Sequence, residues 1–474
     1  MIATRRKVVL YNPHAVFFTM PLALLAVGSH LDPERYEVVI IDGRLDPDAE
    51  RTLVSQLHDA VCLGVTVLTG APISDALRIS RAAKAAHPQL PVVWGGWHPS
   101  MFGIECLAEP CVDVTVQGQG EATFAEIVER LAAGDSLEGC AGCMVRLPDG
   151  RVLKNPARPL LPLDSFRPHD YGLIPVERYF ELKGKRQLDY ISSQGCNFRC
   201  AFCSDPFVYG REWVGIDPQN VALALRDLQA RYGFTDVNFQ DETFFTRRDR
   251  VQALAQRLID EKVEITWAAT MRADQGMRLP QELWALAKRS GLRRLLVGVE
   301  SGDNAMLKRI KKDIKIEQVY EVARRMQEMK IAGNFPFIVG FPDETDESVA
   351  ATIACVKRLR AMSPDFETPI FYFKPYPGSA IVLEAVSKGF RLPDNLSEWS
   401  QFDFVAGLPG PWVSGTKYQL IERFKFFQEL AWRRTSAGWD LLQRLARFRC
   451  RRDEYRWPIE MNLLNWLQPR ERLS

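Results

Sequence analysis

Three cysteines stand close together in this chain, with the spacing C-x3-C-x2-C at Cys196, Cys200 and Cys203. Thiolates are soft ligands that select zinc, copper(I) or iron–sulfur clusters. A structural zinc site takes four protein ligands, often as two separated pairs, and no fourth cysteine stands nearby. The triplet therefore fits a [4Fe–4S] cluster in which three irons are held by the protein and the fourth is open to a small chelating molecule.

The residues around the triplet suit a cluster. The apolar segment 188–193 predicts a strand, and Gly195 permits a tight turn directly after it. Phe198 and Phe202 can shield a cluster from water, which tunes its reduction potential. A partial zinc site or buried free thiols are the alternatives, and both leave the agreement between the spacing and the flanking strand unexplained.

The triplet follows a first strand and has Phe202 directly before its last cysteine, and in this it resembles the signature of the radical S-adenosylmethionine (SAM) superfamily. The resemblance implies that SAM chelates the open iron through its amino and carboxylate groups and that Phe202 borders SAM. It also implies that reduction of the cluster cleaves SAM to a 5′-deoxyadenosyl radical. An external electron donor such as flavodoxin or ferredoxin is then required.

The first 140 residues alternate strand-like and helix-like segments. Such alternation predicts a doubly wound, Rossmann-like parallel sheet. Ligands of these sheets bind at the carboxyl ends of the strands. The expected strands are 7–11, 36–41, 60–67, 91–94 and 113–117, and the expected helices are 22–31, 73–86 and 122–132.

Small or flexible residues follow three of the expected strands, in loops that begin at Thr66, Gly95 and Gln117. Such loops let a large flat ligand approach the backbone, although paired glycines also serve ordinary turns. Their types and order resemble the cobalamin-binding domain that precedes the barrel in one radical SAM subclass. The resemblance implies cobalamin contacts from Thr66, Leu68, Thr69, Gly95, Gly96, His98, Gln117, Gly118 and Glu121.

The motif D-x-H-x-x-G, which supplies a histidine beneath cobalt in another type of cobalamin methyltransferase, is absent from the sequence. The resemblance therefore implies base-off cobalamin without a protein histidine ligand. A weakly ligated lower face favours cob(I)alamin and transfer of methyl as a radical. His98 is expected at the periphery of the cofactor, and a loop histidine with no ligand role is the alternative.

Residues 141–186 are predicted to connect two domains, with a hairpin at Pro148-Asp149-Gly150. From residue 187 a second alternation begins. Its six strand–helix units predict a partial (β/α)6 barrel, the radical SAM architecture, with active residues at the carboxyl ends of the strands. The expected strands are 188–193, 236–240, 265–269, 294–299, 335–339 and 370–374, and the expected helices are 219–231, 248–261, 280–289, 316–329 and 346–362.

Polar and flexible residues end several barrel strands. The resemblance implies that Asp241 or Glu242 contacts the SAM amino group, and the departure from the common G-G-E pattern leaves open which acid acts. It further implies that Arg272 pairs with the SAM carboxylate, that Glu300 accepts hydrogen bonds from SAM, and that the backbone at Gly340 borders adenine. Charges at a barrel rim without a ligand are the alternative.

Three further features keep two interpretations each. Tyr372 and Tyr376 follow the sixth strand and either line a substrate cavity or cap the core. Cys140 and Cys143 are either half of a metal site or a pair of ordinary cysteines. The helical region 386–474 either packs its aromatic side chains on a neighbouring domain, or it lies on a membrane surface or binds an acidic substrate. That region contains Trp412, Phe424, Phe426, Phe427, Trp432, Trp439, Phe448 and the arginines 433, 434, 444, 447, 449, 451 and 452.

Composition sets the broad class. With 46% apolar and 25% charged residues, the 474-residue chain is typical of a soluble globular protein of two or three domains. The net charge of +2 gives no sign of a nucleic-acid partner. No apolar run of about 18 residues predicts a transmembrane helix, and we expect no secretory signal. Ten unevenly spaced cysteines do not suggest a disulfide framework, and a reducing cytoplasm is expected.

These inferences combine into an α/β enzyme with a cobalamin-binding domain at 1–140, a connector at 141–186, a radical SAM barrel at 187–385 and a helical region at 386–474. The predicted activity is methylation of an unactivated carbon of a small molecule, through a 5′-deoxyadenosyl radical and methylcobalamin. The alternatives are an anaerobic oxidative cyclase or hydroxylase, a ring-rearranging enzyme and a non-catalytic cobalamin sensor.

Overall fold

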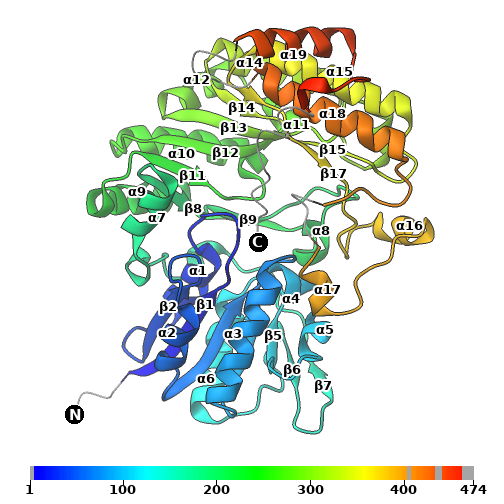
Figure 1. Cartoon of the computed structure of the whole chain (residues 1–474). Helices are drawn as coiled ribbons and strands as arrows, with labels where there is room; N and C mark the ends of the chain where they lie inside the picture. The colour runs from blue at the N-terminus through cyan, green and yellow to red at the C-terminus, as the bar shows by residue number, and fades with distance from the viewer. Residues whose placement is uncertain (1–4, 403–406, 433–439, 462–474) are drawn as a thin grey trace.

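The computed structural model describes residues 5–402, 407–432 and 440–461. Two helix-covered sheets face one another, the first built from the N-terminal part of the chain (blue and cyan in Figure 1) and the second from the middle (green). The strand β9 (Ser193–Gly195) and the short helix α8 (Asp205–Val208) lie between them. The cysteine loop therefore occupies the junction of the two halves.

The first sheet has seven strands in the order β2-β1-β3-β4-β5-β6-β7. Its first five strands are parallel, as the alternation predicts. The strands are β1 (Arg6–Asn12), β2 (Tyr36–Asp42), β3 (Ala60–Thr66), β4 (Val92–Gly95), β5 (Val114–Val116), β6 (Cys143–Arg146) and β7 (Val152–Lys154).

The hairpin predicted at residues 148–150 is confirmed, because β6 and β7 pair antiparallel around it. It is not part of a free connector, however. Strand β6 pairs antiparallel with β5, so the first sheet continues to Lys154 instead of ending at residue 140. The hairpin covers an edge of β5 whose backbone groups would otherwise lack partners.

The three predicted helices of this domain are α1 (Leu22–His30), α3 (Pro72–Ala86) and α6 (Glu121–Ala133). Helix α2 (Ala49–Gln56) was not expected. Only Ala49 and Leu53 of that helix are buried, so its apolar periodicity is weak in the sequence. The remaining helices of this part are α4 (Trp97–Met101), α5 (Gly103–Leu107) and α7 (Val176–Lys183).

The second sheet has six parallel strands in the order β16-β14-β13-β12-β11-β8. The predicted strand 335–339 is a strand only in its second half, and Pro336, which has no backbone N–H to continue a ladder, separates that half from the strand at 332–334. The second half of it, β15 (Phe337–Val339), pairs with β17 (Ile370–Tyr372). The other strands are β8 (Gln187–Tyr190), β11 (Asp236–Phe239), β12 (Thr266–Arg272), β13 (Leu292–Gly298), β14 (Ala332–Asn334) and β16 (Phe366–Glu367), and β10 (Trp213–Gly215) pairs with β9.

All five predicted barrel helices are present, as α9 (Pro218–Tyr232), α10 (Arg248–Asp260), α12 (Gln281–Arg289), α14 (Ile316–Glu328) and α15 (Asp346–Met362). The short helix α11 (Ala273–Arg278) begins directly after β12, and the short helix α13 (Asn304–Arg309) follows the turn after β13. No helix in the described ranges combines the length and the apolar character that crossing a membrane requires.

The C-terminal region packs against both halves of the molecule. Helix α17 (Leu396–Trp399) returns to the first domain, where the Trp399 ring lies 4.6 Å from Phe102. Phe424 and Phe427 of α18 (Gly415–Trp432) are fully buried, so these aromatics serve packing. Phe448 of α19 (Asp440–Arg452) is 54% exposed. Arg433, Arg434 and Trp439 lie outside the described residues.

Replacement of Trp399 tests whether α17 packs against the first domain. We expect Trp399→Ala to lower the free energy of unfolding by about 3–5 kcal/mol, the usual cost of removing a large buried aromatic side chain. Trp457 is 74% exposed, so Trp457→Ala is the matched control and should change the free energy of unfolding by less than about 0.5 kcal/mol. Urea unfolding followed by circular dichroism measures both, and equal effects of the two substitutions would contradict the packing.

Candidate active site

A cavity of about 600 Å³ lies at the carboxyl ends of the strands of the first sheet. Its floor comes from β1, β3, β4 and β5 and its side from α1. The second domain contributes Ile191, Gln194, Gln240 and Glu242 on the opposite side, from β9 and from the residues that follow β8 and β11. This is the edge at which ligands of doubly wound sheets bind, and here the other domain closes it.

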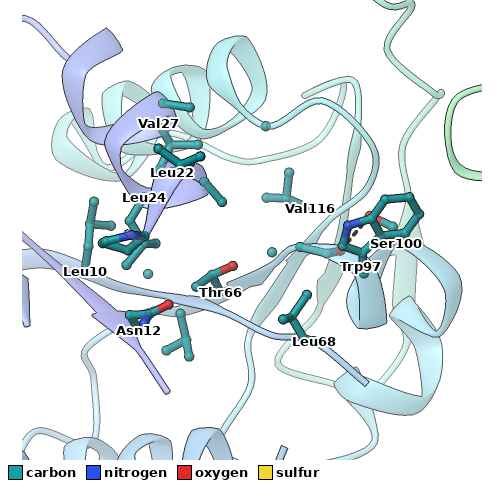
Figure 2. Close-up of a pocket in the computed structure, with 18 of the residues that line it drawn as sticks. Leu10, Asn12, Leu22, Leu24, Val27, Thr66, Leu68, Trp97, Ser100 and Val116 are labelled. Carbon is teal, nitrogen blue, oxygen red and sulfur yellow. Dashed lines mark hydrogen bonds between the residues drawn. The ribbon is translucent and has the colours of Figure 1, made fainter. Parts of the chain in front are cut away.

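The depth of the cavity is apolar. Figure 2 shows side chains from β1, α1 and β5 converging there, while Thr66, Leu68 and Trp97 stand nearer the strand ends. Glycines shape this space: a Cβ on Gly64 would lie 2.7 Å from Leu10 Cδ2, and one on Gly96 would lie 3.1 Å from Thr66 Oγ1. Such an apolar slot below glycine loops fits a large ligand whose flat face approaches the backbone.

Six of the nine residues expected to contact cobalamin line this cavity: Thr66, Leu68, Gly95, Gly96, Gly118 and Glu121. Thr69, His98 and Gln117 are not among the lining residues. Gln117 instead donates from Nε2 to Thr115 Oγ1 at 2.9 Å. Trp97, the neighbour of His98, lines the cavity in its place.

His98 is turned away from the cavity and fully buried. Its Nδ1 lies 3.1 Å from Thr69 Oγ1, and its ring packs 4.8 Å from that of Phe102 and 5.9 Å from that of Trp399. Burial lowers the pKa of His98 to about 3, so the ring is neutral. No histidine is among the described residues that line the cavity. The geometry thus agrees with the alternative in which His98 is not a ligand.

Buried hydrogen bonds join the two domains beside the cavity. Gln194 Nε2 donates to Glu121 Oε1 at 3.0 Å, and Gln119 Nε2 donates to Gln194 Oε1 at 3.0 Å. The rings of Trp97 and Tyr209 also meet across the junction, at 5.8 Å. Neither Gln194 nor Tyr209 was predicted as a site residue. The position of Gln194, two residues before Cys196, is the sequence feature that could have indicated it.

The three cysteines occupy a loop whose two ends are paired by β9 and β10. Cys196, Cys200 and Cys203 are half-buried, whereas the other seven cysteines of the chain are buried. Gly195 begins the loop with φ of 84°, and a Cβ there would lie 2.4 Å from the Glu212 carbonyl oxygen. A glycine is therefore required at this turn.

Three soft thiol donors on one accessible loop fit an iron–sulfur cluster. No three His, Cys, Asp or Glu side chains within the described ranges gather around a point that would hold a single metal ion. Burial raises the pKa of Cys196 to about 11, so this thiol keeps its proton until a metal displaces it. The arrangement suits ligands that each bind a different iron.

Arg272 lies against the cysteine loop as well as at the end of β12. Its guanidinium is buried, with Nη1 3.5 Å from Cys200 Sγ and the Phe198 ring 3.8 Å away. Asp274 accepts from Nε at 3.0 Å and balances the charge. A cation in this place stabilises negative charge on the adjacent sulfur.

The structure distinguishes Asp241 from Glu242, which the sequence did not. Asp241 is fully committed to the turn after β8, because its carboxylate accepts from Ser192 N at 2.8 Å and from the hydroxyls of Ser192 and Ser193. Glu242 lines the cavity and accepts from Gly195 N at 3.3 Å. Burial, followed by the neighbouring carboxylate of Asp205, raises the pKa of Glu242 to about 8. Glu242 is the acid that faces the cavity.

Glu300 lies two residues after β13 in a left-handed conformation, with φ of 69°. Its Oε1 accepts from Lys312 Nζ at 2.7 Å, and both side chains are buried. Burial opposes the charge on Lys312, but Glu300 raises the pKa of this lysine above its ordinary value. Lys312 was not predicted from the sequence. It also lies 5.9 Å from the centre of the Phe202 ring.

Gly340 follows β15 with φ of 78°, and its carbonyl oxygen accepts from Trp412 Nε1 at 2.8 Å. The two tyrosines proposed for substrate do not line the cavity. Tyr372 donates to Glu422 Oε1 at 3.1 Å beneath α18, and the Tyr376 ring lies 5.3 Å from that of Phe402. Both contacts are of the kind expected from the alternative in which these tyrosines cap the core.

Comparisons with known proteins agree with this geometry. Residues 190–356 match the model of the Radical SAM superfamily, and residues 9–128 match that of the B12 binding domain. The uncharacterized methyltransferase PH0819 of Pyrococcus horikoshii is 30% identical over 396 residues, which cover 82% of this chain and 83% of that protein. Cytidylyl-2-hydroxyethylphosphonate methyltransferase of Streptomyces wedmorensis is 25% identical over 490 residues, covering 89% and 90%.

Solved structures share the fold. The radical SAM methyltransferase TsrM of Kitasatospora setae superimposes with a TM-score of 0.69 at 17% identity, covering 86% of this chain and 85% of TsrM. The cobalamin-dependent radical enzyme OxsB gives a TM-score of 0.73 at 16% identity, covering 94% and 71%. The two domains and their shared cavity define a radical SAM enzyme. More particularly, the chain belongs to the cobalamin-dependent radical SAM family, whose cofactors are a [4Fe–4S] cluster, SAM and cobalamin.

Removal of a single thiol tests the cluster site. We expect Cys200→Ala to lose the visible charge-transfer absorption and most of the iron, which should be about four atoms per chain after anaerobic reconstitution of the unsubstituted protein. Cys143→Ala is the matched control and should retain both, because Cys143 lies in β6 of the first sheet. Iron that stays with Cys200→Ala but leaves with Cys143→Ala would move the cluster to the Cys140–Cys143 pair.

The position of His98 predicts that the cobalt of cobalamin has no histidine ligand from the protein. We expect electron paramagnetic resonance of the cob(II)alamin form to lack nitrogen superhyperfine splitting, with the same spectrum in His98→Ala, because the imidazole faces Phe102 and Trp399. Splitting that disappears in His98→Ala would make this histidine a ligand. Splitting that persists there would come from the base of the cofactor itself and would contradict the base-off state.

Proposed function

We propose that this enzyme transfers a methyl group from SAM to an unactivated carbon of a small-molecule substrate. The observation that carries the proposal is the shared cavity, whose floor belongs to the cobalamin-binding sheet and whose opposite side belongs to the barrel. A carbon placed there would lie against the cobalamin-binding sheet on one side and against Gln194 and Glu242, which adjoin the start of the cysteine loop, on the other. The three cysteines themselves are not among the lining residues. When bound, the cluster and SAM supply a 5′-deoxyadenosyl radical and cobalamin supplies the methyl group.

The residues of the chain bind the cofactors, orient them and shield the cavity from water. We assign Cys196, Cys200 and Cys203 to the cluster, and Glu242 to the SAM amino group because it faces the cavity. Arg272 and the Glu300–Lys312 pair are buried, and they set the charge around the cysteine loop. Ile191, Val208 and Tyr209 help to exclude water from the cavity, and radicals survive only where water is excluded.

A second candidate rests on another relative. The anaerobic magnesium-protoporphyrin IX monomethyl ester cyclase of Synechocystis sp. is 26% identical over 351 residues, which cover 73% of this chain and 69% of that protein. An oxidative cyclase would use the same cofactors to insert oxygen derived from water. Both candidates need an external one-electron donor and suit a reducing cytoplasm.

A labelling experiment separates the two candidates before any substrate is known. Reduced protein with methyl-deuterated SAM should give about one S-adenosylhomocysteine per chain, and the corrinoid extracted afterwards should carry three deuteriums. A parallel incubation without reductant should give neither. Mass spectrometry measures both products. Formation of 5′-deoxyadenosine alone, with an unlabelled corrinoid, would favour the cyclase.

A further inference from the structure

The segment 308–315, which runs from the last turn of α13 to the residue before α14, contacts the cysteine loop. Its Ile310 carbonyl oxygen accepts from Ala201 N at 2.8 Å. Its Asp313 forms an ion pair with Arg199 at 2.8 Å. The segment thus holds the loop at Arg199 and Ala201.

This segment also comes close to a cysteine sulfur. The Lys312 carbonyl oxygen accepts from Arg272 Nη2, while Nη1 of the same guanidinium lies 3.5 Å from Cys200 Sγ. A single planar group therefore separates the backbone of the segment from a ligand of the cluster. A molecule bound to the exposed side of this segment is therefore separated from Cys200 by the backbone of the segment and one guanidinium.

The outer side of the segment is basic. Burial alternates along it, so that Ile310, Lys312 and Ile314 point inward while Lys311, Asp313 and Lys315 are exposed. Left-handed backbone at two non-glycine residues, with φ of 52° at Lys311 and 55° at Asp313, maintains this alternation.

A third exposed lysine, Lys308, lies in the last turn of α13. None of Lys308, Lys311 and Lys315 has an ion-pair partner within residues 5–402, 407–432 and 440–461. Two carboxylates lie close in sequence to these lysines: Asp313 is paired with Arg199, and Glu317 accepts from Asn304 Nδ2 at 3.3 Å. We call the three exposed lysines the basic face.

We infer that the basic face is the docking surface for an acidic one-electron carrier protein of the flavodoxin type, an inference that rests on the proposed function. Charge complementarity steers such partners and sets their orientation. The position of the face, one guanidinium away from Cys200, brings a docked redox centre toward the cluster. One electron leaves the reduced flavin of the carrier and enters the cluster, so the carrier is oxidised by one electron and the cluster is reduced by one.

Binding measurements test the surface without any turnover. The probe is a bacterial flavodoxin, titrated calorimetrically into the reconstituted enzyme at low and high ionic strength. We expect Lys308→Glu/Lys311→Glu/Lys315→Glu to raise the Kd at least tenfold, and salt to weaken binding of the unsubstituted enzyme. Carbodiimide should also cross-link flavodoxin carboxylates to Lys311 or a neighbouring lysine.

The matched control reverses three other lysines, as Lys154→Glu/Lys262→Glu/Lys330→Glu. These are exposed, and two of them share the left-handed backbone of Lys311, with φ of 54° and 52°. The control should bind flavodoxin as the unsubstituted enzyme does. Lys308→Gln/Lys311→Gln/Lys315→Gln, which removes charge without reversing it, should weaken binding by a smaller factor.

Two reductants separate this inference from the proposed function. Dithionite needs no docking, so dithionite-driven S-adenosylhomocysteine formation should be equal in the basic-face variant and the unsubstituted enzyme, while flavodoxin-driven formation should fall at least tenfold. Loss of both activities in the unsubstituted enzyme would reject the proposed function. An unchanged Kd in the basic-face variant, equal weakening in the control, or no binding of flavodoxin at low salt would overturn the docking surface.

Discussion

The carboxyl edges of two parallel sheets face one another, and the buried hydrogen bonds among Gln119, Gln194 and Glu121 hold them in register. Everything else in the site depends on this contact. Parallel sheets bind ligands at their carboxyl edges, so two such edges brought together put two ligand sites into one space. Because Gln194 is two residues from Cys196, the same contact also fixes the start of the cysteine loop.

Buried charge is the second constraint on the barrel mouth. The pairs Glu300–Lys312 and Arg272–Asp274 are removed from water and satisfied within the protein. Breaking one partner of such a pair leaves an uncompensated buried charge, so each pair is costly to disturb. Asp241 is likewise committed to backbone and hydroxyl donors of the turn after β8. These residues build the frame, and Glu242 is left to face the cavity.

Strand-end residues were predictable because the alternation of strands and helices dictates which positions meet at a carboxyl edge. Thr66, Gly96 and Gly118 were placed at the cavity in this way. The direction of the side chains that follow β4, in the short helix α4, was not predictable. His98 and Trp97 are neighbours, yet His98 packs on nearby Phe102 and on Trp399 from the C-terminal region, whereas Trp97 lines the cavity.

The sequence by itself determined the α/β fold class and the family, and it predicted the cluster ligands, because these follow from local spacing and periodicity. Only the tertiary structure decided the roles that depend on contacts between distant segments. Lys312 reaches Glu300 across 12 residues, and Tyr372 meets Glu422 across 50. It also decided that the hairpin after Cys140 belongs to the first sheet, because an open edge of β5 is available only once that sheet has formed.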